Sequence, residues 1–330
     1  MRTYIVLIAV IWLGSFSHSV AAAAYQVTDS RGQHTLTHIP KRVAAMNWDI
    51  AEQVLSLGVT PVAMPNIAGY RAWVKQPDVP QGVEDIGRRA EPNLEKLARL
   101  KPDVIIADST LLELAPTLSK IAPVLFYTTY SVKHENSPKR EDSPKRENSP
   151  KHENAKAAIE NFRLIAQVLG RETLAEQRLT QMNQEIASLK QQLHQAYGHS
   201  LPKVAVFRFA SPTAIYLYGD NAMPQYALSL LGIAPVLPMP SSQWGVTQKR
   251  LRILSQIPAT DVALYIRPFE QEARLRKSVM WQALPVVKAG HVHAVEPVWS
   301  YGGAMSILYN ARALTQALIA VAKAAPTARD

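Results

Sequence analysis

The chain has 330 residues, of which 47% are hydrophobic and 19% charged, and its 36 Lys and Arg outnumber its 26 Asp and Glu. This length allows about two domains, and the ordinary apolar share excludes a wholly disordered chain and a polytopic membrane protein. The chain contains no cysteine, which excludes disulfides, thiolate metal sites, a cysteine nucleophile and a lipid-modified N-terminal cysteine. The positive excess is compatible with an anionic ligand, an anionic surface or nucleic acid, but scattered solvated charge is the preferred interpretation, and no nucleic-acid partner is expected.

Residues 1–24 are typical of a secretory signal peptide. Arg2 is their only charged residue, a short apolar run follows it, and the segment ends in four alanines. The apolar run is shorter than the roughly 20 residues that span a bilayer, although an uncleaved membrane anchor is the alternative. No later stretch is apolar enough to cross a membrane. We therefore expect cleavage after Ala22 or Ala24 and a mature protein in the periplasm.

The first half of the mature chain alternates short apolar strands with amphipathic helices. We predict strands at 42–46, 59–64 and 104–107, and helices at 49–57 and from residue 94 onward. This alternation predicts a parallel sheet covered by helices.

The same alternation returns after residue 200. It predicts strands at 203–209, 261–267 and 291–296, and helices at 224–231, 247–254 and 303–324. The fold class is therefore α/β, with two α/β lobes.

A stretch of 39 residues, 155–193, joins the two lobes and contains one glycine, Gly170, and no proline. Its apolar residues recur at helical spacing, which predicts two helices divided at Gly170, the second of them long. A helical connection is stiff, so we expect little motion between the lobes. The predicted divisions are a signal peptide at 1–24, a first lobe at 25–165, an interdomain helix at 166–196 and a second lobe at 197–330.

A tandem repeat lies just before this connection. The unit 133–138, with the sequence Lys-His-Glu-Asn-Ser-Pro, recurs with changes at 139–144 and 145–150 and in part at 151–154. A six-residue unit with Ser-Pro and no apolar face cannot join a core. We therefore predict a disordered surface insertion at 133–154.

Several large aromatic residues lie in turn-like contexts rather than in periodic apolar segments. Examples are Trp73 in Tyr-Arg-Ala-Trp, Trp244 in Gln-Trp-Gly, and Trp299 in Val-Trp-Ser-Tyr-Gly-Gly. Open α/β sheets bind ligands beyond the carboxyl ends of their strands, so aromatic residues on such loops are candidate walls of a ligand site. The alternative is that each of them only packs its loop onto a lobe.

Segments from nearly the whole mature chain match one known family in the same order. They are Asn47-Trp48, Tyr70–Val74, Asp85–Glu95, Lys101-Pro102-Asp103, Ile121-Ala122-Pro123, Trp281–Pro285 and Val298–Gly302. The run Gly-Arg-Arg-Ala-Glu-Pro-Asn at 87–93 is fairly specific, whereas Lys-Pro-Asp is shared by a wider cluster that also binds cobalamin or haem. The chain resembles the periplasmic ferric-hydroxamate (ferrichrome-type) siderophore-binding proteins of ABC importers.

The resemblance implies a bilobed binding protein with a rigid interdomain helix and a shallow aromatic cleft. Its ligand would be an Fe(III)–hydroxamate siderophore, its partner an inner-membrane ABC permease, and the protein would be a monomer without a cofactor or a metal site of its own. Arg89 matches the arginine that contacts the hydroxamate oxygens, and aromatic residues match the walls. The candidate ligand-binding residues are Arg89, Trp48, Tyr70, Trp73, Trp244, Trp299 and Tyr301.

Two positions depart from the family pattern. A further cleft tyrosine of the family is Leu111 here, and an acidic position of the second lobe is Arg252. Because acidic residues on both lobes generally dock the permease in this cluster, the second departure affects the expected partner contact. The alternatives are cobalamin or haem binding and, from a different class, an exported siderophore hydrolase. A hydrolase needs an activated nucleophile, and no Gly-x-Ser-x-Gly turn occurs, so no enzymatic activity is expected.

Overall fold

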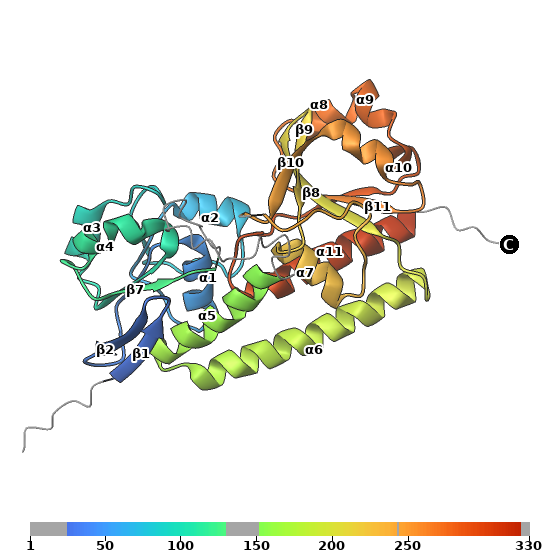
Figure 1. The fold of residues 1–330 in the computed structure, drawn as a ribbon. Coiled ribbons are helices and arrows are strands. Elements are labelled where there is room, and N and C mark those ends of the chain that lie inside the picture. Colours follow the sequence, from blue (N-terminus) through green and yellow to red (C-terminus); the bar gives the residue numbers. More distant parts are fainter. Residues whose placement is uncertain (1–24, 130–151, 243, 325–330) are drawn as a thin grey trace, which may run out of the picture.

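Two α/β lobes lie side by side and are joined by long helices (Figure 1). The structure, a computed structural model, describes residues 25–129, 152–242 and 244–324. The predicted signal peptide and most of the predicted insertion lie outside these ranges. None of the helices in the described ranges is both long and apolar enough to cross a membrane. The predicted α/β class with two lobes is confirmed.

The first lobe is built on a five-stranded parallel sheet with the order β5-β4-β3-β6-β7. Its strands are β3 (Val43–Ala45), β4 (Ala63–Met64), β5 (Glu84–Asp85), β6 (Val104–Asp108) and β7 (Val124–Tyr127). The helical segments are α1 (Trp48–Ser56), α2 (Ile67–Trp73), α3 (Leu94–Arg99), the 3₁₀ segment η1 (Ser109–Leu114) and α4 (Ala115–Leu118). An antiparallel hairpin of β1 (Tyr25–Asp29) and β2 (Gly32–Leu36) precedes them.

The second lobe has a mixed five-stranded sheet with the order β10-β9-β8-β11-β12. Its strands are β8 (Val204–Ser211), β9 (Ala214–Tyr218), β10 (Val246–Arg250), β11 (Val262–Ile266) and β12 (Val292–Val295). The strands β8, β11 and β12 are parallel, and β9 and β10 are antiparallel to their neighbours. The helices are α7 (Met223–Leu230), α8 (Glu272–Arg276), α9 (Val279–Gln282) and α10 (Pro285–Lys288).

The predicted helix at 247–254 is wrong. Residues 246–250 form the edge strand β10, which pairs with β9 along its whole length, from Val246 opposite Tyr218 to Arg250 opposite Ala214. Residues 251–256 form the short 3₁₀ segment η2 (Leu251–Gln256). The apolar residues that suggested helical spacing all lie in η2, whereas the polar stretch before them gains backbone partners by joining the sheet.

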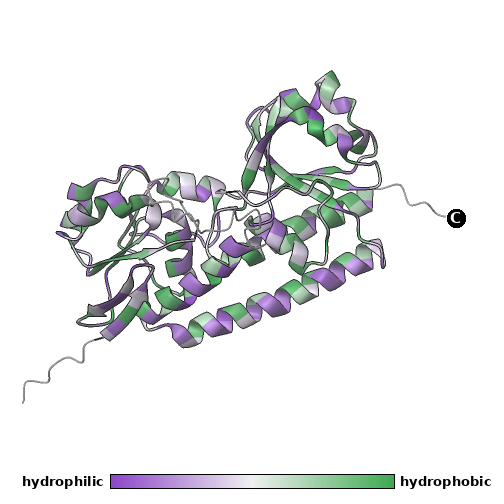
Figure 2. Cartoon of the chain, in the orientation of Figure 1, coloured by the Kyte–Doolittle hydropathy of each residue, from purple (hydrophilic) through white to green (hydrophobic). Residues whose placement is uncertain are grey.

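The connection between the lobes consists of α5 (Glu153–Leu169) and α6 (Glu172–Tyr197), so the predicted division at Gly170 is confirmed. Gly170 has a φ of +61°, the left-handed conformation in which a helix commonly ends at glycine. One face of α6 is apolar and turned toward the molecule, and the other is hydrophilic (Figure 2). The insertion prediction is wrong for Glu153 and Asn154, because α5 begins at Glu153 and Asn154 is buried.

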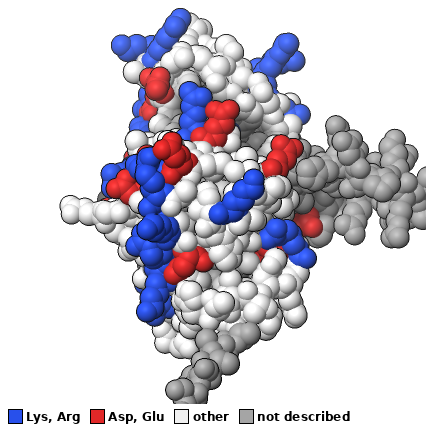
Figure 3. All heavy atoms as spheres, turned by 90° about the vertical axis from the view of Figure 1, so that its left-hand side faces the viewer, with Lys and Arg blue, Asp and Glu red and all other residues white. Residues whose placement is uncertain are grey.

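Charge is divided unequally between the lobes. Residues 25–129 contain eleven Lys and Arg and eleven Asp and Glu, whereas residues 198–324 contain twelve and five. On the face seen in Figure 3, basic and acidic side chains lie next to one another, and a column of basic ones follows one edge. Most of the positive excess of the chain therefore belongs to the second lobe.

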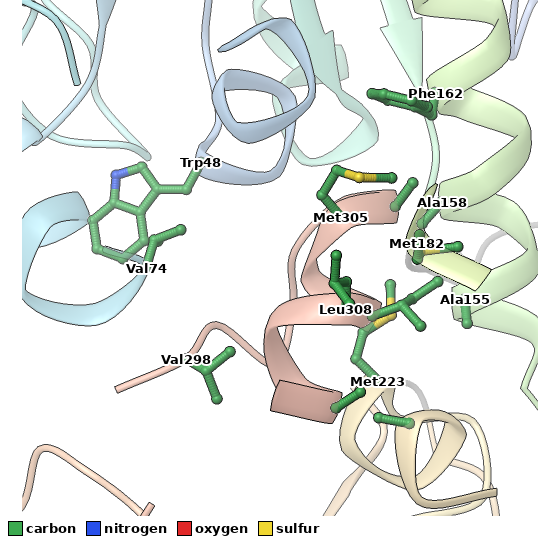
Figure 4. Close-up of a cluster of buried hydrophobic side chains, with 14 of the residues drawn as sticks. Trp48, Val74, Ala155, Ala158, Phe162, Met182, Met223, Val298, Met305 and Leu308 are labelled. Carbon is green, nitrogen blue, oxygen red and sulfur yellow. The ribbon is translucent and has the colours of Figure 1, made fainter. Parts of the chain in front are cut away.

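One hydrophobic core extends from one lobe into the other. The C-terminal helix α11 (Ala304–Ala324) packs on α6 and α7 and also contacts α5 and α1. In Figure 4, Trp48 of the first lobe, Met223 of the second and Met305 of α11 belong to the same buried cluster. Smaller clusters fill the opposite side of each sheet. The two lobes are thus packed together rather than tethered.

A buried carboxyl group links α1 to the start of α11. Glu52 is 0% exposed and accepts hydrogen bonds from the backbone N–H groups of Ser306 (2.7 Å) and Gly303 (3.2 Å) and from the Ser306 hydroxyl (2.5 Å). Burial raises the pKa of Glu52 to about 7, although these hydrogen bonds favour the ionised form.

This pKa makes the free energy of unfolding depend on pH. The ordinary pKa of the group is 4.5, so between pH 4.5 and about 7 the folded protein binds a proton that the unfolded chain has released. Stability from this group is full below pH 4.5 and declines as the pH rises through that window. We expect the free energy of unfolding, measured with urea, to fall less steeply between pH 5 and 7 in Glu52→Gln than in the parent, by a slope that corresponds to about one proton. An unchanged slope for the variant would contradict the raised pKa.

Candidate functional site

A large cavity opens between the lobes, where the carboxyl ends of strands from both sheets meet. Its volume is about 870 Å³. The first lobe lines it with the residues that follow β3 and β6, and the second lobe with residues of β8 and β11. A further part of the wall comes from the segment between β12 and α11, residues 296–303, which we call the crossover segment. Open α/β sheets bind their ligands at this edge, where strands end and loops begin.

Arg89 is presented to the cavity by a tight loop between β5 and α3. Within it, Gly87 has a φ of +89°, which glycine adopts without strain, and its N–H donates to Asp85 Oδ1 (2.8 Å). Gly87 also pairs with Pro92 across the loop. The guanidinium carbon of Arg89 lies 4.1 Å from the ring centroid of Trp48. A guanidinium stacked on an indole keeps its N–H groups available for an anionic partner.

Two carboxyl groups, Asp49 and Asp108, line the cavity beside Arg89. Burial raises the pKa of Asp49 well above its ordinary value, and the Asp108 charge raises it further. Burial also raises the pKa of Asp108, while hydrogen bonds from Thr110 and the charge of Arg89 lower it. Partial burial lowers the pKa of Arg89, which nevertheless stays charged. Because neighbouring carboxylates repel, the pair retains a proton more readily than an isolated Asp does.

Aromatic rings build a continuous wall next to Arg89. The Trp299 ring centroid lies 5.1 Å from that of Trp48, 6.5 Å from that of Trp73 and 5.4 Å from that of Tyr301, all in edge-to-face geometry. The Arg89 guanidinium carbon is 5.6 Å from the centroid of the Trp299 ring. Trp244 also lines the cavity and is 44% exposed, which is unusual for so large an apolar side chain. This wall offers flat apolar faces beside a cation.

Six of the seven predicted site residues line this cavity, and Tyr70 does not. Tyr70 is 0% exposed and lies on the buried stripe of α2 together with Ile67, with Val74 following the helix on the same side. Its ring meets the Trp48 ring edge-on at 6.3 Å, from the side of the core. Trp73 is one residue short of Val74 and therefore points about 100° away, toward the cavity. The prediction for Tyr70 as a ligand-wall residue is corrected to a core role.

A second guanidinium, Arg208, enters the cavity from β8 of the second lobe. Its carbon lies 4.6 Å from the Tyr216 ring centroid, and its charge and hydrogen bond to Tyr301 partly offset the burial that raises the pKa of that tyrosine. Its Nε is buried and has no hydrogen-bond partner in the described part of the chain. Arg267, by contrast, is paired with Glu272 at 2.8 Å. Arg208 is thus the cation of this lobe that a ligand can engage.

Among the cavity residues that were not predicted, three charged ones have a signal in the sequence. Asp108 is the last residue of an apolar strand, and Asp49 comes four residues after one. Arg208 is the single charged residue in the run Val-Ala-Val-Phe-Arg-Phe-Ala. A charge at the end of a buried strand or within it needs a partner, and a ligand cleft supplies one. Leu111 lines the cavity at the position where the family has a tyrosine.

The chain belongs to the periplasmic binding protein family, whose sequence pattern matches residues 43–297. It is 26% identical over 286 residues to the iron(3+)-hydroxamate-binding protein FhuD of Escherichia coli, covering 86% of this chain and 89% of that protein. It is 24% identical to the Fe(3+) dicitrate-binding periplasmic protein FecB of the same organism, covering 85% of this chain and 84% of that one.

Solved structures agree with the family assignment. The siderophore-binding protein FhuD of Vibrio cholerae, bound to Fe3+–Desferal, is 44% identical with a TM-score of 0.77, and the match covers 87% of this chain and 99% of that one. Staphylococcus aureus SirA in complex with staphyloferrin B has a TM-score of 0.60 at 20% identity, over 89% of this chain and 98% of that one, which shows a shared fold.

The charge of Arg89 should affect the measured pKa of Asp108. Because Arg89 stabilises the ionised form of Asp108, we expect Arg89→Met to raise the pKa of the Asp108 carboxyl further above its present value. The measurement is a pH titration of the carboxyl carbon by NMR in aspartate-labelled protein, with Asp108→Asn to assign the signal. Arg88→Met is the matched control, since the Arg88 side chain is 87% exposed. An equal Asp108 pKa in all three proteins would separate Arg89 from the acid pair.

Proposed function

We propose that the protein binds an Fe(III)–hydroxamate siderophore in the cavity between its lobes and delivers it to a membrane-embedded ABC importer. The observation that carries this proposal is Arg89, stacked on Trp48 and facing a cavity walled by Trp299 and other aromatic residues. The 44% identical protein of Vibrio cholerae, bound to Fe3+–Desferal, supports the ligand class.

The chemistry of the cavity suits such a ligand. In a ferric hydroxamate the iron is saturated by the siderophore, and the coordinating oxygens carry partial negative charge on one side of the complex. A guanidinium donates parallel hydrogen bonds to such oxygens without competing for the metal. The flat faces of Trp73, Trp299 and Tyr301 contact the apolar arms and lose little conformational entropy. The volume of about 870 Å³ lies within the range of small-molecule sites.

A ferric carboxylate complex is the second candidate, and Arg208 is the observation that favours it. Its buried Nε has no partner in the described part of the chain. The cavity therefore offers Arg89 from the first lobe and Arg208 from the second, whereas Arg267, which also lines it, is paired with Glu272. Two guanidiniums suit a ligand with several carboxylate groups. FecB, a relative at 24% identity, is named for ferric dicitrate.

Binding titrations separate these ligand classes. Purified protein is titrated with ferrioxamine B, ferrichrome, ferric dicitrate and cyanocobalamin while tryptophan fluorescence is recorded. We expect saturable quenching by the hydroxamates at the lowest concentrations, because four tryptophans line the cavity. Tighter binding of ferric dicitrate would favour the second candidate. Binding of cobalamin alone would overturn both.

The proposed partner and compartment follow from the same assignment. A protein of this family collects its ligand outside the inner membrane, in the periplasm, and docks on the importer as a monomer. The second lobe presents Lys249, Arg250 and Arg252 together along one shallow groove, whose described lining contains no acidic residue. We therefore propose that the importer surface facing this lobe is acidic, the reverse of the charge arrangement that the family resemblance implied.

Arg89→Lys tests the proposed binding geometry. Lysine keeps the charge but offers a point charge where two parallel hydrogen bonds are needed. Hydrogen bonds to charged groups contribute about 1.5–3 kcal/mol, so we expect roughly tenfold or greater loss of ferrioxamine B affinity. Arg88→Lys should leave affinity unchanged, because that side chain faces solvent. Circular dichroism checks the fold of both variants. Equal affinity of all three proteins would remove Arg89 from the ligand site.

A further inference from the structure

The crossover segment carries part of the aromatic wall but belongs to no strand or helix. Trp299 and Tyr301 lie within it, between the end of β12 and the start of α11. A loop of this kind positions its side chains only as well as its backbone is held. Among the contacts that hold this backbone are hydrogen bonds to Glu52 of the first lobe and from Asn310 of α11.

Glu52 reaches the first turn of α11 because the side chains of α1 pack very closely against the backbone of Gly302 and Gly303. A Cβ added to Gly302 would lie 2.3 Å from Glu52 Oε2 and 1.8 Å from Ser306 Oγ. A Cβ added to Gly303 would lie 2.2 Å from Cγ of Gln53. All three distances are shorter than real contacts allow, so two consecutive glycines let the helix start dock this closely on α1. The carboxyl then meets two backbone N–H groups and one hydroxyl in a dry interface.

From Ser306 the hydrogen bonds continue into the crossover segment. The Asn310 side-chain amide donates to the carbonyl oxygens of Ser306 (2.8 Å) and Trp299 (3.2 Å). The Ser300 hydroxyl donates to the Tyr218 hydroxyl at 2.7 Å, which ties the next residue to β9 of the second lobe. A connected path therefore leads from Glu52 to the backbone of Trp299, whose ring stands 5.1 Å from that of Trp48.

We propose that Glu52 is a positioning residue of the ligand cavity: it anchors the crossover segment to α1 and so sets the Trp299 ring against Arg89 and Trp48. Glu52 itself does not line the cavity. It lies one helical turn beyond Trp48 and Asp49, on the same short helix α1. One rigid element therefore carries the ring under Arg89, an acid beside it and the anchor of the opposite wall.

Removing the Glu52 carboxyl would leave buried backbone N–H groups at the start of α11 with fewer acceptors. Without the Glu52 carboxyl, the buried N–H of Gly303 would lose the acceptor that the structure gives it, and the N–H of Ser306 would keep only the Gly303 carbonyl oxygen at 3.2 Å. In a protein without this carboxyl, we expect the start of α11 to shift toward water or other acceptors. The crossover segment would shift with it, because the Asn310 amide binds both Ser306 and Trp299. A carboxylate at the start of α11 also interacts favourably with the dipole of this 21-residue helix.

The first arm of the test reports on Trp299 without any ligand. The full protein is labelled with 5-fluorotryptophan, and the Trp299 fluorine signal is assigned by its loss in Trp299→Phe. We expect Glu52→Ala to shift or broaden this signal and Glu52→Gln, which keeps one acceptor oxygen, to do so less. The matched control is Asn161→Ala, which removes a buried amide whose hydrogen bond to Thr129 (3.0 Å) is remote from the cavity lining. An unmoved signal in Glu52→Ala, or an equal shift in Asn161→Ala, overturns the proposal.

The second arm measures ferrioxamine B affinity and rests on the proposed function. We expect a roughly tenfold loss for Glu52→Ala, a smaller loss for Glu52→Gln and none for Asn161→Ala. If the folded Glu52→Ala protein shows the fluorine shift but keeps its affinity for ferrioxamine B, Glu52 positions Trp299 only in the unbound cavity. That result would overturn the claim that Glu52 positions the wall for ligand binding. If Glu52→Ala does not fold, Ser306→Ala, which removes only the hydroxyl bond, takes its place in both arms with the same criteria. If the parent protein binds ferrichrome but not ferrioxamine B, ferrichrome replaces it in this arm. If the parent binds neither hydroxamate, the proposed function fails and the fluorine arm alone decides the role of Glu52.

Discussion

The shared hydrophobic core between the lobes is the constraint on which the cavity depends. The helices α5, α6 and α11 contribute apolar faces to it, and so do α1 of the first lobe and α7 of the second. Separating the lobes would expose this surface to water, at a cost of about 25 cal/mol for each Å². A flexible linker would impose no such cost. The cavity walls are therefore set by folding, and a ligand meets a site that is already formed.

Because the site is already formed, its polar groups need little rearrangement when a ligand binds. Arg89 is stacked on Trp48, and two acids stand beside it, so its position is defined before a ligand arrives. Fewer side chains have to be ordered on binding, which preserves affinity. The acid pair also limits the field of Arg89. Because the pair retains a proton more readily than isolated carboxyls do, Arg89 remains able to attract an anionic ligand surface.

Much of this arrangement could be predicted from the sequence, because it depends on local patterns. Alternating apolar segments indicated the two sheets, and Gly170 marked the division between α5 and α6. The loop with Arg89 was identified through a family motif, and its glycine has the positive φ that such a turn needs. The edge strand β10 was missed because its polar sequence is stabilised by pairing with β9, a partner that no local pattern reveals. Tyr70 and Trp73 show the same limit. They lie three positions apart on α2, and the sequence does not tell which of the two rings faces the core and which faces the cavity.

The distribution of charge shows why net charge alone is a poor guide to the site. The first lobe is balanced between residues 25 and 129, and several of its surface charges are paired, such as Arg99 with Glu95 at 2.7 Å. At ordinary ionic strength, salt screens the field of such exposed charges over a distance of about 10 Å. The guanidiniums of Arg89 and Arg208 act instead between apolar walls, where the effective dielectric constant is lower and charge interactions are stronger. Two side chains in the cavity therefore influence the ligand more than the larger number of basic residues on the surface of the second lobe.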